Sequence, residues 1–141
     1  MKGLALGQTA HVTRSFLTPD IAAYRTLSAD KNLQFGRAAN RETVPGPLLG
    51  GLFSHLLGTR LPGRGTNWLK QTLAFPHPAY IGEAITATVE IVRLRPEKEL
   101  VNLRTICTNP AGDIVCHGEA LVLVRHLEEK SDLEVLMNHP P

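Results

Sequence analysis

A strongly apolar stretch at residues 45–58 constrains the fold more than any other part of the chain. Six large apolar side chains recur there at the three- and four-residue spacing of one helix face: Leu48, Leu49, Leu52, Phe53, Leu56 and Leu57. Pro47 suits the first helical position, because a proline there loses no intrahelical hydrogen bond. We therefore predict one long helix whose apolar face another layer must cover.

A second stripe on the same predicted helix consists of small residues: Pro47, Gly50, Gly51, Ser54 and Gly58. A glycine inside a helix costs about 1 kcal/mol relative to alanine. The adjacent glycines Gly50 and Gly51 therefore indicate that something approaches the helix closely, either strand backbone or a ligand.

Strand patterns follow a turn at residues 61–65. We predict strands over 67–75, 83–95, 100–108 and 113–124, the last three joined by the short turns 96–99 and 109–112. Alternate positions of two of these strands are mainly apolar: Ile85, Ala87, Val89 and Ile91, then Val101, Leu103, Thr105 and Cys107. Three strands joined this way form an antiparallel meander that must bury one face. The long helix is the obvious partner, which predicts an α+β fold.

The residues before the long helix and after the last strand have weaker patterns. Residues 9–17 read as a strand and residues 18–28 as a helix, with Pro19 and Asp20 suited to its first turn. Residues 29–44 read as a loop with a short helix over 37–42. Residues 128–141 are charged and end in two prolines, as expected of a loosely held tail. We therefore expect one domain over 1–127, followed by a tail over 128–141.

Composition excludes several classes of protein. A chain of 141 residues suits one domain, and a net charge of +2 with scattered basic residues argues against nucleic acid as a partner. No apolar run approaches the roughly 20 residues of a membrane helix, and the N-terminal apolar stretch is too short for a secretory signal, so a cytoplasmic protein is expected. Cys107 and Cys116 are expected to be buried thiols. No His, Cys or carboxylate cluster has metal-ligand spacing, so neither a metal nor a cofactor is expected.

Three stretches together carry a family resemblance. Residues 52–66 end the predicted helix and contain a Leu-Pro-Gly turn, residues 75–83 read Phe-Pro-His-Pro-Ala-Tyr-Ile-Gly-Glu, and residues 109–120 form a hairpin. Over about residues 7–124 the chain resembles the MaoC-like hydratases and dehydratases, which include (R)-specific enoyl-CoA hydratases. The resemblance implies a hot dog fold, in which an antiparallel sheet wraps around a long central helix. It also implies an acyl-CoA or acyl-carrier-protein thioester as ligand, and a homodimer or a heterodimer with a catalytic hot dog subunit.

The catalytic motif of this family reads Ser-Gly-Asp-x-Asn-Pro-x-His. Its Asp and His activate the water that adds to an enoyl thioester, a reaction that needs a proton acceptor and a proton donor. The matching stretch, residues 28–35, keeps Asp30 and Asn32 but has Phe35 in place of the histidine. No histidine lies between His11 and His55, and the loop after Asp30 is shorter than in the family. The resemblance thus implies Asp30 and Asn32 as catalytic residues in an altered site.

Other positions of the family site persist. Gly46 matches the glycine whose backbone N–H binds the thioester oxygen. Ser54 matches a serine near the catalytic pair, so the resemblance implies Ser54 as a third catalytic residue. Gly50 and Gly51 would line the acyl slot. Without the resemblance these residues have plainer interpretations: Gly46 as a turn, Ser54 as helix packing and Asp30 as a loop cap.

A basic contact for the CoA phosphates is expected near the Leu-Pro-Gly turn. Arg60, Arg64 and Lys70 are candidates, and Arg64 is our choice, although any of them could be solvated surface charge. The resemblance favours an (R)-specific enoyl-CoA hydratase or 3-hydroxyacyl dehydratase with an altered site. The alternatives are a non-catalytic substrate-binding subunit of a heteromeric dehydratase, or a hot dog thioesterase.

Overall fold

The structure of this protein is a computed structural model that describes residues 1, 3–28, 37–38 and 41–128. Seven strands, two α-helices and one 3₁₀ turn follow one another along these residues. Their bounds are β1 (Thr9–Ser15), α1 (Thr18–Ser28), β2 (Arg37–Ala38), β3 (Arg41–Glu42), α2 (Gly46–Thr59), β4 (Asn67–Gln71), β5 (Ala84–Arg95), the 3₁₀ turn (Pro96–Lys98), β6 (Leu100–Thr108) and β7 (Ile114–Leu123).

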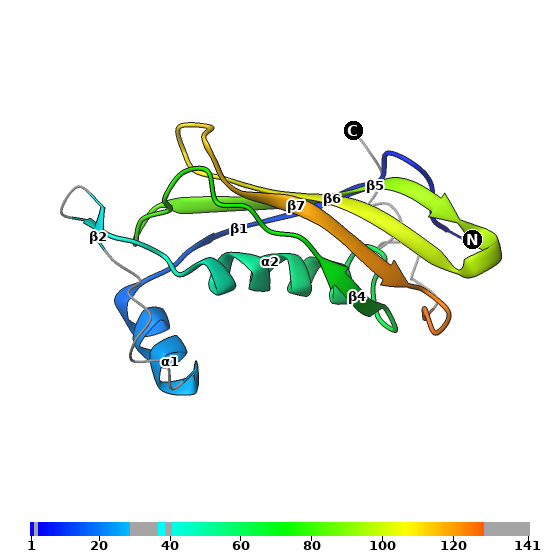
Figure 1. The fold of residues 1–141 in the computed structure, drawn as a ribbon, viewed down its shortest axis with the longest axis horizontal. Helices are drawn as coiled ribbons and strands as arrows, with labels where there is room; N and C mark the ends of the chain where they lie inside the picture. The colour runs from blue at the N-terminus through cyan, green and yellow to red at the C-terminus, as the bar shows by residue number, and fades with distance from the viewer. Residues whose placement is uncertain (2, 29–36, 39–40, 129–141) are drawn as a thin grey trace.

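Five of the strands form one antiparallel sheet in the order β1-β5-β6-β7-β4. The predicted meander β5-β6-β7 occupies its middle, and β1 and β4 lie at its edges. Helix α2 runs along one face of the sheet, as Figure 1 shows. The predicted α+β layer is confirmed, and α2 and the three meander strands lie within one or two residues of their predicted bounds.

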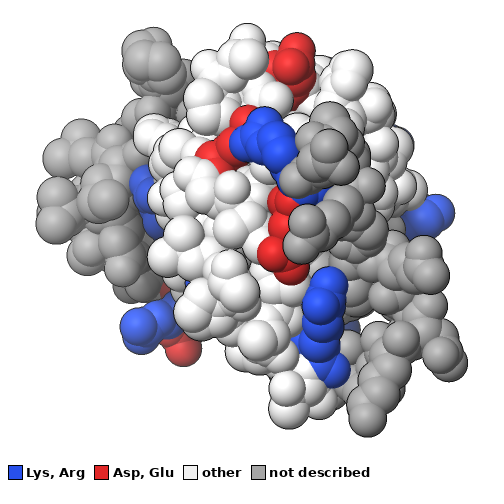
Figure 2. Space-filling view, turned by 90° about the vertical axis from the view of Figure 1, so that its left-hand side faces the viewer, with Lys and Arg blue, Asp and Glu red and all other residues white. Residues whose placement is uncertain are grey.

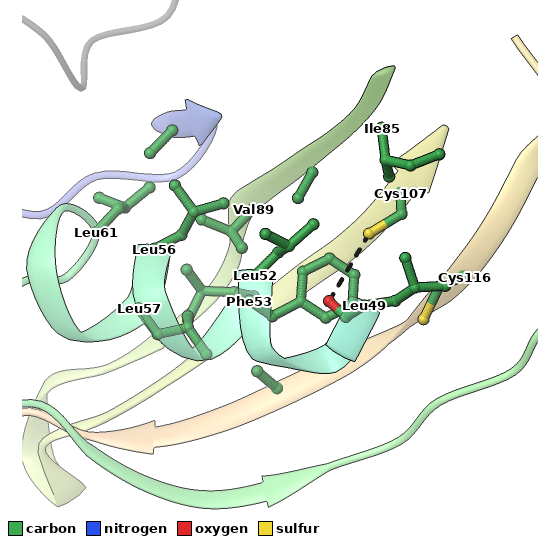
Figure 3. Close-up of a cluster of buried hydrophobic side chains, with 14 of the residues drawn as sticks. Leu49, Leu52, Phe53, Leu56, Leu57, Leu61, Ile85, Val89, Cys107 and Cys116 are labelled. Atoms are coloured by element: carbon green, nitrogen blue, oxygen red, sulfur yellow. Dashed lines mark hydrogen bonds between the residues drawn. The ribbon is translucent and has the colours of Figure 1, made fainter. Parts of the chain in front are cut away.

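The core lies between α2 and the sheet. Phe53 and Leu56 of α2 are completely buried against sheet residues such as Val89 (Figure 3). The alternate positions predicted to be inward-facing in β5 and β6 are all buried. Burial of each such large apolar side chain contributes about 1.5–3 kcal/mol, so packing of α2 is the main reason that its glycine-rich sequence stays helical.

The two cysteines pair across the sheet. Cys107 of β6 is the register partner of Cys116 of β7, and both are buried free thiols, as predicted. The Cys107 Sγ lies 4.0 Å from the carbonyl oxygen of Leu49 on α2 (Figure 3). A hydrogen bond with the Cys116 thiol, and then burial, raise the pKa of Cys107 above its ordinary value.

Two sequence predictions need correction. The short helix predicted over 37–42 is wrong, because β2 and β3 pair antiparallel there. Directly after β3, Thr43 forms a bridge with Tyr80, and the Val44 N–H donates to the Ala79 carbonyl oxygen at 2.7 Å. Strand pairing between β2 and β3, and between Thr43 and the distant Tyr80, therefore outweighed the weak helical pattern of residues 37–42. The strand predicted over 67–75 ends at Gln71 instead.

Candidate functional site

The N-terminus of α2 has no side-chain cap. The residue before the helix, Pro45, has extended backbone angles (φ −57°, ψ 138°) and no hydroxyl or carboxylate to offer. The carbonyl oxygen of Pro45 accepts the Leu48 N–H at 3.0 Å. Because Pro47 has no N–H, Gly46 carries the backbone N–H at the start of the helix, where the positive end of the helix dipole lies.

The small-residue stripe of α2 divides into two parts. Gly50 is buried and Gly58 is half-buried, whereas Pro47, Gly51 and Ser54 are exposed. Gly46, which precedes the stripe, is half-buried. A Cβ on Gly51 would meet no described atom within 4 Å. Close approach of another part of the protein therefore explains Gly50, whereas no described protein atom approaches Gly51. One side of the stripe is covered by protein, and the other is open beside the helix N-terminus.

The covered side is closed by Leu73 and Phe75, two residues that the sequence did not assign to the site. A Cβ on Gly50 would lie 3.2 Å from the Leu73 Cδ1, and a Cβ on Gly46 would lie 2.7 Å from the Phe75 Cζ. Strand residues two apart are separated by about 6.6 Å, and helix residues four apart by about 6 Å. The spacing from Leu73 to Phe75 therefore matches one turn of α2, so that Leu73 lies against Gly50 and Phe75 lies against Gly46.

Backbone hydrogen bonds hold this segment in place after β4 has ended. The Thr72 N–H donates to the Glu119 carbonyl oxygen at 3.0 Å, and Ala74 and His117 exchange two bonds of 2.8 and 2.9 Å. A Cβ on Gly118 would overlap the carbonyl oxygen of Thr72, so the glycine permits this approach. The signal that could have identified Leu73 and Phe75 is their two-residue spacing from Gln71, which would place all three side chains on one face of an extended segment. Gln71 itself points inward and bonds a core residue.

That inward bond orients the segment. The Gln71 Nε2 donates to the hydroxyl of the buried Thr105 at 3.0 Å, which places the Gln71 side chain on the face of the sheet that packs on α2. Successive strand side chains point to opposite faces, so Leu73 and Phe75 also face the helix. Phe75 is nevertheless 48% exposed and Leu73 39% exposed. Both side chains thus combine contact with α2 and a surface open to solvent.

The chain is similar to known enzymes over most of its length, although no family model matches it. It is 37% identical over 128 residues to the (R)-specific enoyl-CoA hydratase of Aeromonas caviae, covering 86% of this chain and 96% of the relative. It is 39% identical over 125 residues to the (R)-specific enoyl-CoA hydratase of Rhodospirillum rubrum, covering 84% and 86%. The solved (R)-hydratase from A. caviae, involved in PHA biosynthesis, superposes with a TM-score of 0.81 at 37% identity, covering 87% of this chain and 98% of that one.

The chain belongs to the (R)-specific enoyl-CoA hydratase family. The family resemblance inferred from the three stretches is thereby confirmed, and so is the hot dog fold. The helix at the centre of the hot dog is α2, and the strands wrapped around it are β1, β5, β6, β7 and β4.

The predicted site residues of this hydratase family member fall into three groups. Gly46, Gly50, Gly51 and Ser54 lie together along α2. Asp30 and Asn32 lie outside the described residues, as does Phe35. Arg64 is exposed in the turn that follows α2, and a helix of this length separates it from Gly46 by about 20 Å. The structure therefore unites the helix residues but does not bring Arg64 to the same end.

The other basic candidates have different surroundings. Arg60 donates from its Nη1 to the His11 carbonyl oxygen at 2.8 Å, which ties the end of α2 to β1, and Lys70 is exposed on β4. On the end of the molecule that carries α1, basic and acidic side chains are interspersed rather than gathered into one basic surface (Figure 2). Within the described ranges there is no group of three or more His, Cys, Asp or Glu residues placed to hold a metal. No helix there is long and apolar enough to cross a membrane.

Proposed function

We propose that this hydratase family member binds acyl thioesters along the open side of the α2 stripe and hydrates enoyl thioesters through an altered site. The observation that carries the proposal is the uncapped N-terminus of α2 beside the exposed residues Gly51 and Ser54. A thioester carbonyl oxygen placed at Gly46 would accept its N–H, and the acyl chain would then pass along small residues that leave room for it.

One carboxylate can complete the proton balance of hydration. Asp30 would accept a proton from water as the water oxygen bonds to the β carbon of the enoyl thioester. The same carboxyl group would then return a proton to the α carbon, while Asn32 and Ser54 hold the water in place. The reverse sequence dehydrates a 3-hydroxyacyl thioester. Because the family histidine is replaced near Phe35, we expect a rate lower than that of a complete site by about 10²–10⁴-fold.

The absence of any histidine between His11 and His55 favours a second candidate function. The chain would then bind the thioester without chemistry, as the substrate-binding subunit of a heteromeric dehydratase whose partner carries the complete motif. A thioesterase that uses Asp30 and the helix N-terminus is a further alternative, which rests on fold analogy alone.

The test follows the loss of the enoyl ultraviolet absorbance of crotonyl-CoA with the purified chain. We expect slow hydration that Asp30→Asn abolishes, because this change keeps the side-chain shape and removes the base. Glu97→Gln is the matched control, since Glu97 is an exposed carboxylate on the connection from β5 to β6. It should leave the rate unchanged.

Binding is measured beside activity with butyryl-CoA, which has no double bond to hydrate. Binding without any loss of crotonyl-CoA would overturn the hydratase proposal and support the substrate-binding subunit. Release of free CoA from butyryl-CoA would instead identify a thioesterase. Absence of both binding and turnover would contradict all three functions.

We also propose that the chain forms a homodimer through the free edge of β4. One side of β4 pairs with β7, and its other side is an edge of the sheet. Trp68 and Leu69 on this strand are 43% and 54% exposed. Pairing of two copies at this edge would satisfy unpaired backbone groups and cover both side chains. A heterodimer with a catalytic hot dog subunit would use the same edge.

A further inference from the structure

The Phe75 ring lies where the proposed thioester must arrive. The ring contacts the first residue of α2 so closely that a Cβ on Gly46 would lie 2.7, 2.9 and 3.2 Å from three of its atoms. A thioester oxygen that accepts the Gly46 N–H would bring its sulfur and α carbon to within a few ångströms of the same residue. Ring and thioester therefore compete for space at the end of the helix.

The backbone beneath the ring is anchored, whereas the ring itself is free on one side. Ala74, the residue before Phe75, exchanges two hydrogen bonds with His117. The Phe75 side chain is 48% exposed, so about half of its surface is not covered by protein. Rotation about the side-chain bonds can therefore carry the ring toward solvent while the main chain stays bonded to His117.

Leu73 is less free to move than Phe75, because its side chain is less exposed, at 39% compared with 48%. Its Cδ1 would lie 3.2 Å from a Cβ on Gly50, a buried residue one helical turn further along, which is tighter than an ordinary van der Waals contact but less severe than the 2.7 Å between the Phe75 ring and a Cβ on Gly46. Leu73 therefore closes the side of the slot, while Phe75 closes its end.

We propose that Phe75 is an aromatic gate that occupies the thioester position in the free protein and turns aside when an acyl thioester binds. This inference rests on the proposed function, because it requires the thioester to bind at Gly46. Opening the gate gives up the contact of the ring with Gly46, so the gate lowers the affinity of the wild-type protein for its ligand. The gate acts on the thioester group and leaves the binding of the CoA nucleotide untouched.

The test measures butyryl-CoA binding to the full chain by calorimetry, for the wild type and for Phe75→Ala. We expect the variant to bind butyryl-CoA about 3- to 10-fold more tightly, which is the equivalent of one aromatic contact. Its affinity for free CoA should be unchanged. Leu6→Ala is the matched control, because Leu6 is an exposed apolar residue that precedes β1 and lies outside both the β4 edge and the segment that carries Phe75. It should leave both affinities unchanged.

A milder variant, Phe75→Leu, guards against loss of folding and should move the affinity in the same direction by a smaller factor. An unchanged or weaker affinity for butyryl-CoA in both variants would overturn the gate, and a weaker one would identify Phe75 as a wall that contacts the ligand. If neither the wild type nor any variant binds butyryl-CoA, the proposed function itself fails, and the gate fails with it. Binding by the wild type thus separates the two failures.

Discussion

The aromatic ring of Phe75 packs directly on Gly46, so that any side chain at position 46 would collide with it. The contact joins the segment after β4 to the first residue of α2, and the same segment places Leu73 on Gly50 one turn later. Two glycines of the helix are therefore required by neighbouring side chains, and one of these contacts coincides with the proposed thioester position.

Coupling between these two positions is the first prediction. Gly46→Ala should cost about 1 kcal/mol of unfolding free energy in the wild type, because the Phe75 ring must move away. In a Phe75→Ala background the same change should be neutral or stabilising, since alanine is favoured over glycine in helices by up to about 1 kcal/mol. Urea unfolding of the four proteins of this double-mutant cycle measures the coupling energy.

Gly58 provides the control for this cycle. It lies on the same helix, and a Cβ there would meet no described atom within 4 Å. Gly58→Ala should change the unfolding free energy by the same amount in the wild-type and the Phe75→Ala backgrounds. An equal effect of Gly46→Ala in both backgrounds would contradict the close packing of Phe75 on Gly46.

Two other glycines should respond in opposite directions. Gly51→Ala should raise the unfolding free energy by about 0.5–1 kcal/mol, because a Cβ there has open space and alanine favours the helix. Gly118→Ala should lower it by about 2–4 kcal/mol, because the new Cβ overlaps the Thr72 carbonyl oxygen and must break backbone hydrogen bonds. Thermal and urea unfolding measure both changes.

Gly51→Ala also separates a structural glycine from a binding one. If the acyl chain runs along the open side of the stripe, the stabilised variant should bind butyryl-CoA less tightly than the wild type. Unchanged affinity in the stabilised variant would remove Gly51 from the proposed slot.

The raised pKa of Cys107 predicts a loss of stability in alkali, whereas the hydrogen bond with Cys107 lowers the pKa of Cys116, which therefore adds no such loss. In the unfolded chain a cysteine ionises near pH 8.5, whereas the raised pKa of Cys107 keeps this thiol protonated in the folded protein. The unfolded state then binds fewer protons than the folded state above about pH 8.5, so the unfolding free energy falls as the pH rises. This group alone contributes a slope of up to about 1.4 kcal/mol per pH unit.

Urea unfolding between pH 7 and pH 10 measures that slope. Cys107→Ala alone would also remove the hydrogen bond that lowers the pKa of Cys116, so both compared proteins carry Cys116→Ala, and one of them also carries Cys107→Ala. Of these two, the protein that keeps Cys107 should lose stability more steeply, because burial still raises the pKa of this thiol. Identical slopes would mean that Cys107 ionises equally in the folded and unfolded states.

Restoring the family histidine should increase activity. Phe35→His supplies a proton donor and acceptor at the position where the family motif has one, and we expect crotonyl-CoA hydration to rise by about 10²-fold or more. Phe35→Leu is the control, because it changes the side chain without adding a titratable group. A histidine variant that folds and binds butyryl-CoA but hydrates no faster would show that Phe35 does not occupy the catalytic position.

The sheet edge predicts the state of association. Leu69→Lys would place a charge on the exposed edge strand β4 and should convert a homodimer into monomers, as measured by light scattering after gel filtration. Leu17→Lys is the control, because Leu17 is equally exposed at 54% but lies between β1 and α1, away from β4. A wild-type protein that is monomeric throughout would contradict the proposed homodimer.

Local periodicity was sufficient to predict much of this fold. The helical spacing of the leucines located α2, the alternation in β5 and β6 identified the buried face, and short turns ordered the meander. Such patterns can be recognised in the sequence because each one involves only neighbouring residues of a single helix or strand. The pattern failed over residues 37–42, where pairing between short segments outweighed propensity.

The candidate site is predictable only in part for the same reason. Sequence motifs pointed to Gly46 and Ser54 on α2 and to the missing histidine near Phe35, because motifs record residue types at fixed spacing. They predicted strand backbone or a ligand close to both Gly50 and Gly51, whereas the structure places the Leu73 side chain on Gly50 and no described protein atom on Gly51.

The sequence by itself thus determined the helix, the meander and the family to which the chain belongs. Only the tertiary structure decided which side of the glycine stripe is covered, and that Phe75 is the residue which closes the end of α2. That outcome depends on how the edge of the sheet docks against the helix, through bonds from Thr72 and Ala74 to β7. Contacts between residues far apart in the chain are set by packing of the whole domain and leave no periodic trace in either segment.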